Sequence, residues 1–145
     1  MPVGRWLVFD TTVYVAAIRG GVFGPIFRTL EDKLPRTYLV SVVAAELRAG
    51  ATTEAARRTA HELLQRFSRV GRVTTPGPSS WERAGDVLGR LCRDEPHLRS
   101  KIPLLWNDLL IALSAREIGA TVVTENLEGF ELLRGYVRFD LRPFA

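Results

Sequence analysis

The sequence predicts one α/β domain over residues 1–145, in which a mostly parallel central sheet lies between helices in three layers. Two observations predict this class of fold. Short apolar runs of strand length alternate with helical patterns along the whole chain, an order that produces parallel sheets with helices on both faces. The chain has 145 residues, of which 46% are hydrophobic, and both values suit a single domain with one core.

The first strand is expected at residues 6–9, because a continuous apolar run is typical of a strand buried on both faces. A short helix over residues 13–18 follows and ends before the pair Gly20-Gly21. Residues 23–34 predict a second helix, with Pro25 suited to its first turn. The chain therefore opens with one buried strand and two helices.

A second strand is expected at residues 38–40, where the chain is again apolar. Ser41 is a suitable N-cap for a helix over residues 42–49, and Thr53 is one for a longer helix over residues 54–69. Strand and helix thus keep alternating through this part of the chain.

The second half of the chain continues the alternation. Residues 70–74 predict a third strand, and Ser79 or Ser80 is expected to cap a helix with apolar residues at three- and four-residue spacing. Asn107 is expected to cap a helix over residues 108–117. The last two strands are expected at residues 121–124 and 136–139.

The composition excludes several classes of protein. The single cysteine, Cys92, excludes a disulfide framework and a zinc site built on cysteine pairs, and it suits the reducing cytoplasm. We expect no membrane span and no signal peptide, since no apolar run approaches ~18 residues. The net charge is +4, and all but two of the 20 basic residues are arginine. This balance favours an anionic partner, although a GC-rich genome would produce the same composition.

Asp10 directly follows the first expected strand. Ligands of open α/β sheets bind outside the carboxyl ends of the strands, so this carboxylate lies where a site would form. A half-buried carboxylate is costly unless it is paired or binds a metal. The alternative is that Asp10 caps the helix that follows.

Glu46 and Asp108 are the other two candidate site residues. Glu46 lies on an otherwise apolar helix face, where it needs a metal or a partner such as Arg48 or Arg5. Asp108 lies in the first turn of its expected helix, where an acid also complements the helix dipole. Each acid alone has an ordinary explanation, whereas the three together predict a carboxylate cluster.

A carboxylate cluster without histidine or cysteine partners favours a hard cation, Mg²⁺ or Mn²⁺. Such a cation polarises a phosphoryl oxygen and lowers the pKa of water. The chemistry that these residues predict is therefore hydrolysis of a phosphodiester. Thr11 and Ser41 are expected to hydrogen-bond the carboxylates and orient them.

Three segments resemble, in order, the acidic motifs of PIN domains. They are residues 8–14 around Asp10, residues 41–50 around Glu46, and residues 107–112 around Asp108. Residues 119–126 resemble the segment that follows the third motif. The resemblance extends from about residue 6 to about residue 140, which is nearly the whole chain.

The resemblance implies a PIN-like domain with a parallel sheet, flanking helices and the acids at one end. It also implies a metal-dependent endoribonuclease that acts on single-stranded RNA, with Asp10, Glu46 and Asp108 holding Mg²⁺ or Mn²⁺. In bacterial chains of this size, it implies the VapC-type toxin of a type II toxin–antitoxin pair. Such toxins form homodimers, and an antitoxin segment enters their active-site groove.

Two positions depart from the family pattern. Thr12 stands where the family often has an asparagine, and Gly129 stands where a fourth acid is expected. Glu128 or Glu125 would then be the replacement metal ligand, with Asn126 holding a water near the cation. The alternative is that both glutamates face solvent.

Other functions stay open at the level of sequence. The missing fourth acid favours a catalytically weakened PIN module that binds RNA or a protein partner. A phosphodiesterase or flap-type nuclease that acts on DNA is a third hypothesis.

Overall fold

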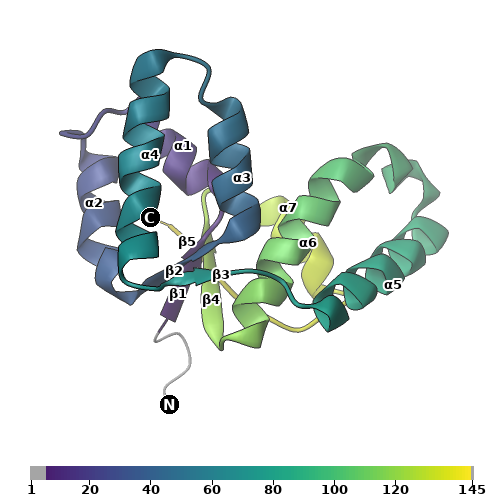
Figure 1. The fold of residues 1–145 in the computed structure, drawn as a ribbon. Coiled ribbons are helices and arrows are strands. Elements are labelled where there is room, and N and C mark those ends of the chain that lie inside the picture. Colours follow the sequence, from purple (N-terminus) through teal and green to yellow (C-terminus); the bar gives the residue numbers. More distant parts are fainter. Residues whose placement is uncertain (1–5, 145) are drawn as a thin grey trace.

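The computed structural model describes residues 6–144, whose centre is a five-stranded sheet with every neighbouring pair parallel (Figure 1). The strand order is β3-β2-β1-β4-β5. The strands are β1 (Trp6–Phe9), β2 (Thr37–Val40), β3 (Val73–Thr74), β4 (Ala120–Thr124) and β5 (Asp140–Pro143). The predicted α/β class with a parallel sheet is therefore confirmed.

Helices cover the sheet on both sides. In Figure 1, the four helices from the first half of the chain gather on one side and the other three on the opposite side. The helices are α1 (Thr11–Arg19), α2 (Pro25–Lys33), α3 (Ser41–Gly50), α4 (Glu54–Arg69), α5 (Pro78–Asp94), α6 (Ile102–Glu117) and α7 (Leu127–Arg134). Two 3₁₀ segments, η1 (Leu34–Arg36) and η2 (Pro96–Lys101), complete the fold. The three layers that the sequence predicted are present.

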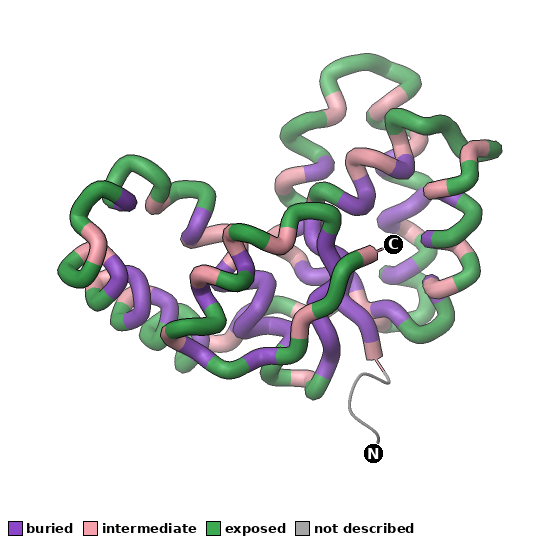
Figure 2. The backbone as a smooth tube through the Cα atoms, turned by 180° about the vertical axis from the view of Figure 1, so that it is seen from behind, coloured by how far each residue is buried: buried purple, intermediate pink, exposed green. Residues whose placement is uncertain are grey.

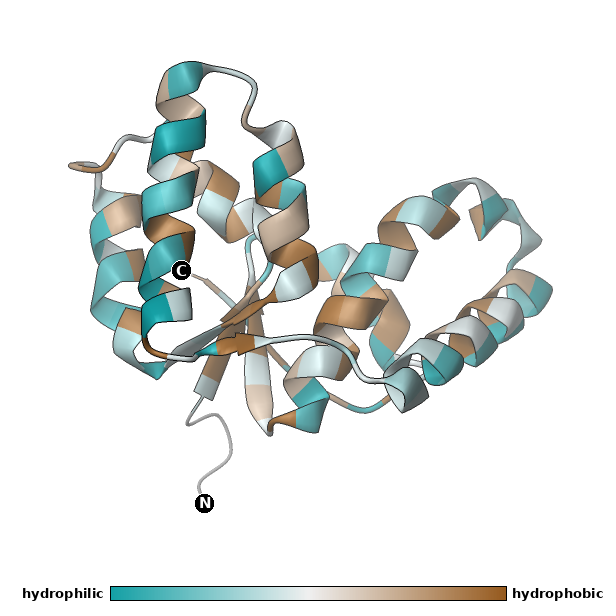
Figure 3. Ribbon diagram, in the orientation of Figure 1, coloured by the Kyte–Doolittle hydropathy of each residue, from teal (hydrophilic) through white to brown (hydrophobic). Residues whose placement is uncertain are grey.

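The core lies along the central strand β1 and its neighbours in the sheet. Leu7 and Val8 of β1 and Val122 of β4 are fully buried, and Figure 2 shows both strands mostly in the colour of buried residues. Helix α6 is buried around most of its circumference because it lies between the sheet and α5. The outward surface of α4 is instead mainly hydrophilic (Figure 3). The strand ends that carry the candidate acids thus rest on a rigid, close-packed base.

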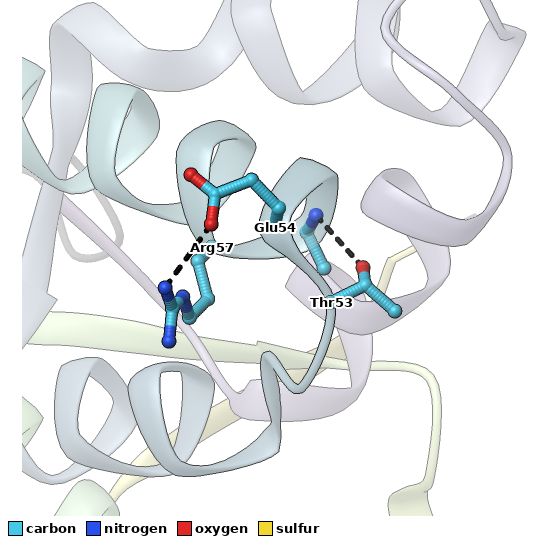
Figure 4. A network of polar contacts seen from close by, with 4 residues as sticks. Thr53, Glu54 and Arg57 are labelled. Atoms are coloured by element: carbon cyan, nitrogen blue, oxygen red, sulfur yellow. Dashed lines mark hydrogen bonds and ion pairs between the residues drawn. The ribbon is translucent and has the colours of Figure 1, made fainter.

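The start of α4 was predicted correctly. The Thr53 hydroxyl accepts a hydrogen bond of 3.1 Å from the Ala56 N–H, and Arg57 pairs with Glu54 at 3.1 Å (Figure 4). A side-chain acceptor at this position satisfies an amide that has no partner within the helix.

Two other predicted N-caps are wrong. Ser41 is the first residue of α3, after the N-cap Val40, and no side-chain capping bond is present there. Helix α5 begins at Pro78, before Ser79 and Ser80, with Gly77 as its N-cap. Proline suits the first helical position because the N–H that it lacks would have no helical partner.

Helix α6 begins earlier than predicted. Asn107 is not an N-cap, because the helix starts at Ile102 and carries Pro103 in its first turn. Asp108 therefore lies inside the helix and not in its first turn. The dipole of the helix N-terminus, which falls off within that turn, is a weaker explanation for an acid at this position.

The last third of the chain holds three further differences. Strand β3 is shorter than predicted, because Gly71 takes a positive φ of 68° just before it. Helix α7 was not predicted; it has only eight residues and contains a glycine, which is a poor helix former. Strand β5 begins at Asp140 although the apolar run lies at residues 136–139. This run is where Val137 and Phe139 are buried, while the strand itself is an edge strand, which tolerates Pro143.

Among residues 6–144, no helix combines the length and the apolar character that crossing a membrane requires.

Candidate active site

Three carboxylates from distant parts of the chain line one cavity at the carboxyl edge of the sheet. Asp10 follows β1, Glu46 lies on α3, which follows β2, and Asp108 lies on α6. The cavity that all three line has a volume of about 430 Å³. The parallel topology brings these residues together because the carboxyl ends of neighbouring parallel strands meet at the same edge.

Asp10 is held at both of its carboxylate oxygens. The Thr12 hydroxyl donates to Oδ1 at 2.6 Å, and the Thr124 hydroxyl donates to Oδ2 at 2.8 Å. Asp10 takes the N-cap position of α1 by its backbone, but its side chain forms no capping hydrogen bond. Since a carboxylate has about four lone-pair sites, lone pairs remain for a further ligand in the cavity.

Burial raises the pKa of Asp10, whose side chain is almost completely enclosed. The hydrogen bonds from Thr12 and Thr124 oppose this effect, and the charge of Glu46 adds to it. Burial of the charged carboxylate therefore costs free energy in the folded protein, and a bound cation would offset this cost.

Glu46 is half-buried and receives a hydrogen bond of 2.7 Å at Oε1 from the Thr11 hydroxyl. None of the ion pairs found among residues 6–144 includes Glu46, so Arg48 is not its partner there. Arg5, the other suggested partner, lies outside the described residues. The second oxygen of Glu46 is available to the cavity.

Asp108 has a strongly perturbed carboxyl group. Its pKa is raised to about 7, first by burial and then by the charges of Asp10 and Glu46. The influence of both other acids on Asp108 shows that the three carboxylates share one electrostatic environment. A divalent cation would remove the causes of the shift, because it replaces lost hydration and neutralises the repulsion.

The position expected to carry a fourth acid lies directly beside Asp108. A Cβ atom built on Gly129 would lie 3.2 Å from Asp108 Oδ2. Glu128 is exposed and lines a second cavity that also includes Asp108, whereas Glu125 lines neither this cavity nor the one shared by the three acids. Glu128 is thus the better placed of the two candidates.

The donor set suits a hard cation, since it consists of carboxylate oxygens supported by hydroxyls and an amide. Among residues 6–144, however, no three histidine, cysteine, aspartate or glutamate side chains converge closely enough to enclose an ion. Binding Mg²⁺ or Mn²⁺ would therefore require rotation of carboxylate side chains within the cavity.

Thr124 is a site residue that the sequence reasoning missed. Its hydroxyl, fully buried at the end of β4, donates to Asp10 and accepts from the Asn126 N–H at 2.9 Å. The signal in the sequence that could have identified it is the Thr-x-Asn pattern of residues 124–126. Asn126 itself lines the acidic cavity, while Ser41 forms no side-chain hydrogen bond to the carboxylates among the contacts of residues 6–144.

The sequence matches the PIN domain family over residues 7–135. The chain belongs to this family. No curated protein matches the sequence significantly.

Solved structures share the fold of this PIN domain. DNA-bound VapBC from Salmonella typhimurium is similar with a TM-score of 0.70 and 23% identity, over 97% of this chain and 98% of that chain. VapBC2 from Rickettsia felis, bound to a promoter DNA fragment, is similar with a TM-score of 0.64 and 21% identity, over 96% of this chain and 98% of that chain. A FitAB-type structure from Neisseria gonorrhoeae is similar with a TM-score of 0.62 and 19% identity, over 93% of this chain and 95% of that chain. The similarity extends over essentially the whole domain.

Proposed function

We propose that this PIN domain is a metal-dependent endoribonuclease that hydrolyses RNA phosphodiester bonds. The observation that carries the proposal is the convergence of Asp10, Glu46 and Asp108 on one cavity, with no basic side chain paired to any of them among residues 6–144. PIN domains are generally nucleases. Carboxylates that repel each other in the metal-free protein are the donor set that Mg²⁺ or Mn²⁺ prefers.

Asp10, Glu46 and Asp108 would hold the cation. When bound, Mg²⁺ or Mn²⁺ would polarise a phosphoryl oxygen of the RNA and lower the pKa of water. Thr12 and Thr124 keep the Asp10 carboxylate in one orientation, and Thr11 does the same for Glu46. Such bonds to ligand side chains typically affect metal affinity and activity by 10- to 100-fold.

Two further residues of the acidic cavity suit an RNA phosphate. Arg19, in the last turn of α1, and Asn126, before α7, both line it. Both side chains carry N–H donors, and arginine in particular matches the geometry of a phosphate. We expect them to orient the scissile phosphate toward the carboxylates.

The decisive experiment is cleavage of single-stranded RNA by the purified protein in Mn²⁺ or Mg²⁺. Cleavage should stop in EDTA and in the variants Asp10→Asn, Glu46→Gln and Asp108→Asn. Asp86→Asn, an exposed acid on α5, is the matched control and should cleave like the wild type. Preferential cleavage of branched DNA would instead favour the flap-type nuclease.

A second candidate function is a catalytically weakened PIN module that binds RNA or a protein partner. The place of Gly129 beside Asp108, where an acid is missing, favours it. This function predicts RNA binding that is unchanged by EDTA and by Asp108→Asn, without cleavage. A binding assay run beside the cleavage assay separates the two functions.

The physiological role that we propose is the toxin of a toxin–antitoxin pair in the cytoplasm. The similar structures are VapBC and FitAB complexes. A mainly apolar cavity between α1, α3 and α4 adjoins the acidic one and shares Arg19 and Glu46 with it. An antitoxin segment lying there would block the acids. Growth arrest on expression, relieved by the product of an adjacent small gene, tests this role.

We also infer that the protein forms a homodimer, as the resemblance to VapC-type toxins implies. Light scattering coupled to size-exclusion chromatography measures the mass directly. A mass near twice the 16.2 kDa of the chain supports the dimer, and a mass near 16.2 kDa contradicts it.

A further inference from the structure

A second cavity, of about 530 Å³, adjoins the acidic one between η2, α6 and α7. Leu104, Asp108 and Asn126 line both cavities. The second cavity is therefore an extension of the candidate active site. Its volume lies within the range of about 300–1,000 Å³ that is typical of pockets for small organic groups.

The wall of this second cavity includes four leucines, Leu98, Leu104, Leu105 and Leu132. Leu104 is 71% exposed, although it is a large apolar side chain, and it lies where the two cavities meet. Apolar side chains of this kind provide the faces between which a flat nucleobase stacks. A phosphate group, in contrast, gains nothing from them.

The polar groups of the second cavity also suit a nucleobase better than a phosphate. Besides Asp108, the carboxylates of Glu95 and Glu128 line it, together with Lys101 and His97. Carboxylates repel phosphate but accept hydrogen bonds from the N–H groups of bases. A lysine can donate to a base carbonyl oxygen.

Gly129 keeps the passage between Asp108 and this cavity open. It lines the second cavity, and a Cβ atom there would already lie 3.2 Å from Asp108 Oδ2. A larger side chain at this position would occupy the space between the carboxylate and the leucines. Gly129, one of the two positions that depart from the family pattern, thus lies beside Asp108, where the two cavities meet.

We propose that the second cavity binds the base of a nucleotide next to the cleaved phosphate and selects guanine. This inference rests on the proposed ribonuclease function. Guanine carries two adjacent donors, N1–H and the 2-amino group, which one carboxylate such as Glu128 can accept together, and its O6 accepts from Lys101. Uracil has a single N–H between two carbonyl oxygens and would place an acceptor against the carboxylates. Glu128 is then a specificity-determining residue and not a fourth metal ligand.

Cleavage of a random single-stranded RNA pool in Mn²⁺ tests the proposal. We expect guanine over uracil by about 10-fold at one position next to the cut, the scale of one bidentate contact. Glu128→Gln should remove most of this preference, and Glu131→Gln, on an exposed part of α7, should retain it. Inosine lacks the 2-amino group, so the wild type should cleave RNA less efficiently at inosine than at guanosine. The Glu128→Gln variant should cleave at both with similar efficiency.

An unchanged base preference in Glu128→Gln would overturn the inference, whether or not this variant also loses Mn²⁺ affinity. Binding of short RNA oligonucleotides to the Asp10→Asn variant, followed by fluorescence anisotropy, separates this inference from the proposed function. Tighter binding of the guanine oligonucleotide than of the uracil one supports the cavity even if the wild type cleaves no RNA. Equal binding of the two oligonucleotides contradicts it.

Discussion

The charge on Asp108 destabilises the metal-free protein. Its pKa in the folded state is about 7, above the value of 3.8 for a free side chain. The folded state therefore retains this proton between about pH 4 and pH 7, where the unfolded state has released it. Stability must then fall as the pH rises through this window. At about 1.4 kcal/mol for each pKa unit, the total loss is up to about 4 kcal/mol.

The measurement is urea denaturation in EDTA at pH 5 and pH 8. Asp108→Asn cannot ionise, so it should be more stable than the wild type at pH 8 and should lose less stability between the two values. Asp86→Asn should follow the wild-type profile. A wild type that is equally stable at both pH values, or no advantage of Asp108→Asn at pH 8, would count against the raised pKa.

Thr124 should contribute to activity although it lines neither of the two cavities. Thr124→Val keeps the shape of the side chain but removes the hydroxyl that donates to Asp10 Oδ2 at 2.8 Å. We expect Mn²⁺ affinity and cleavage rate to fall about 10- to 100-fold, as for other groups that orient a metal ligand. Thr124→Ser restores the hydroxyl and should recover most of both. Equal loss in the two variants would indicate a packing role instead.

The three acids of the candidate site and one of their supports, Thr11, could be predicted from the sequence, whereas the supports Thr12 and Thr124 could not. Asp10, Glu46 and Asp108 stand out because a carboxylate beside apolar neighbours is unusual and three occur in the order of the PIN motifs. Thr124 does not stand out, since threonine is common in strands. Its role depends on a partner 114 positions away in the sequence, which only the pairing of β1 with β4 brings close.

At the scale of elements, the cap of α4 offers a test of local stability. Thr53→Ala removes the acceptor for the Ala56 N–H and should destabilise the protein by about 1 kcal/mol. Thr52→Ala, at the neighbouring exposed threonine, should stay within about 0.5 kcal/mol of the wild type. Urea denaturation of both variants at constant pH measures the difference. Equal stability of the two would show that the cap contributes nothing.

The position of a strand could be predicted where the apolar run in the sequence coincides with the residues that pair in the sheet. The apolar run of β1 is both buried and paired, and its predicted bounds match those observed. The last strand was misplaced because burial and pairing occur in successive segments, Val137 to Phe139 and then Asp140 to Pro143. The predicted helix over residues 108–117 was too short because Asn107 resembles an N-cap, although Pro103 is equally suited to the first turn of a helix. A single sequence does not decide between two such start signals.

At the scale of the molecule, the sheet order determines which residues can form a site. Strand β1 lies between β2 and β4, so Asp10 after β1, Glu46 after β2 and Thr124 at the end of β4 lie at one edge of the sheet. Helix α6 packs against the same strands and adds Asp108 to the cavity. The site therefore depends on the whole domain, and stability and metal binding should be coupled.

This coupling predicts that Mn²⁺ stabilises the entire fold. A ligand that binds only the folded state adds about 2.7 kcal/mol at 100 times its Kd, which corresponds to a rise in Tm of about 10 °C for a domain of this size. Thermal unfolding at pH 7.5, in EDTA and in rising Mn²⁺, measures the effect. Asp10→Asn and Glu46→Gln should show little of this rise, and Asp86→Asn should show all of it. The same rise in all four proteins would mean that Mn²⁺ binds elsewhere, and no rise in the wild type would contradict the carboxylate site.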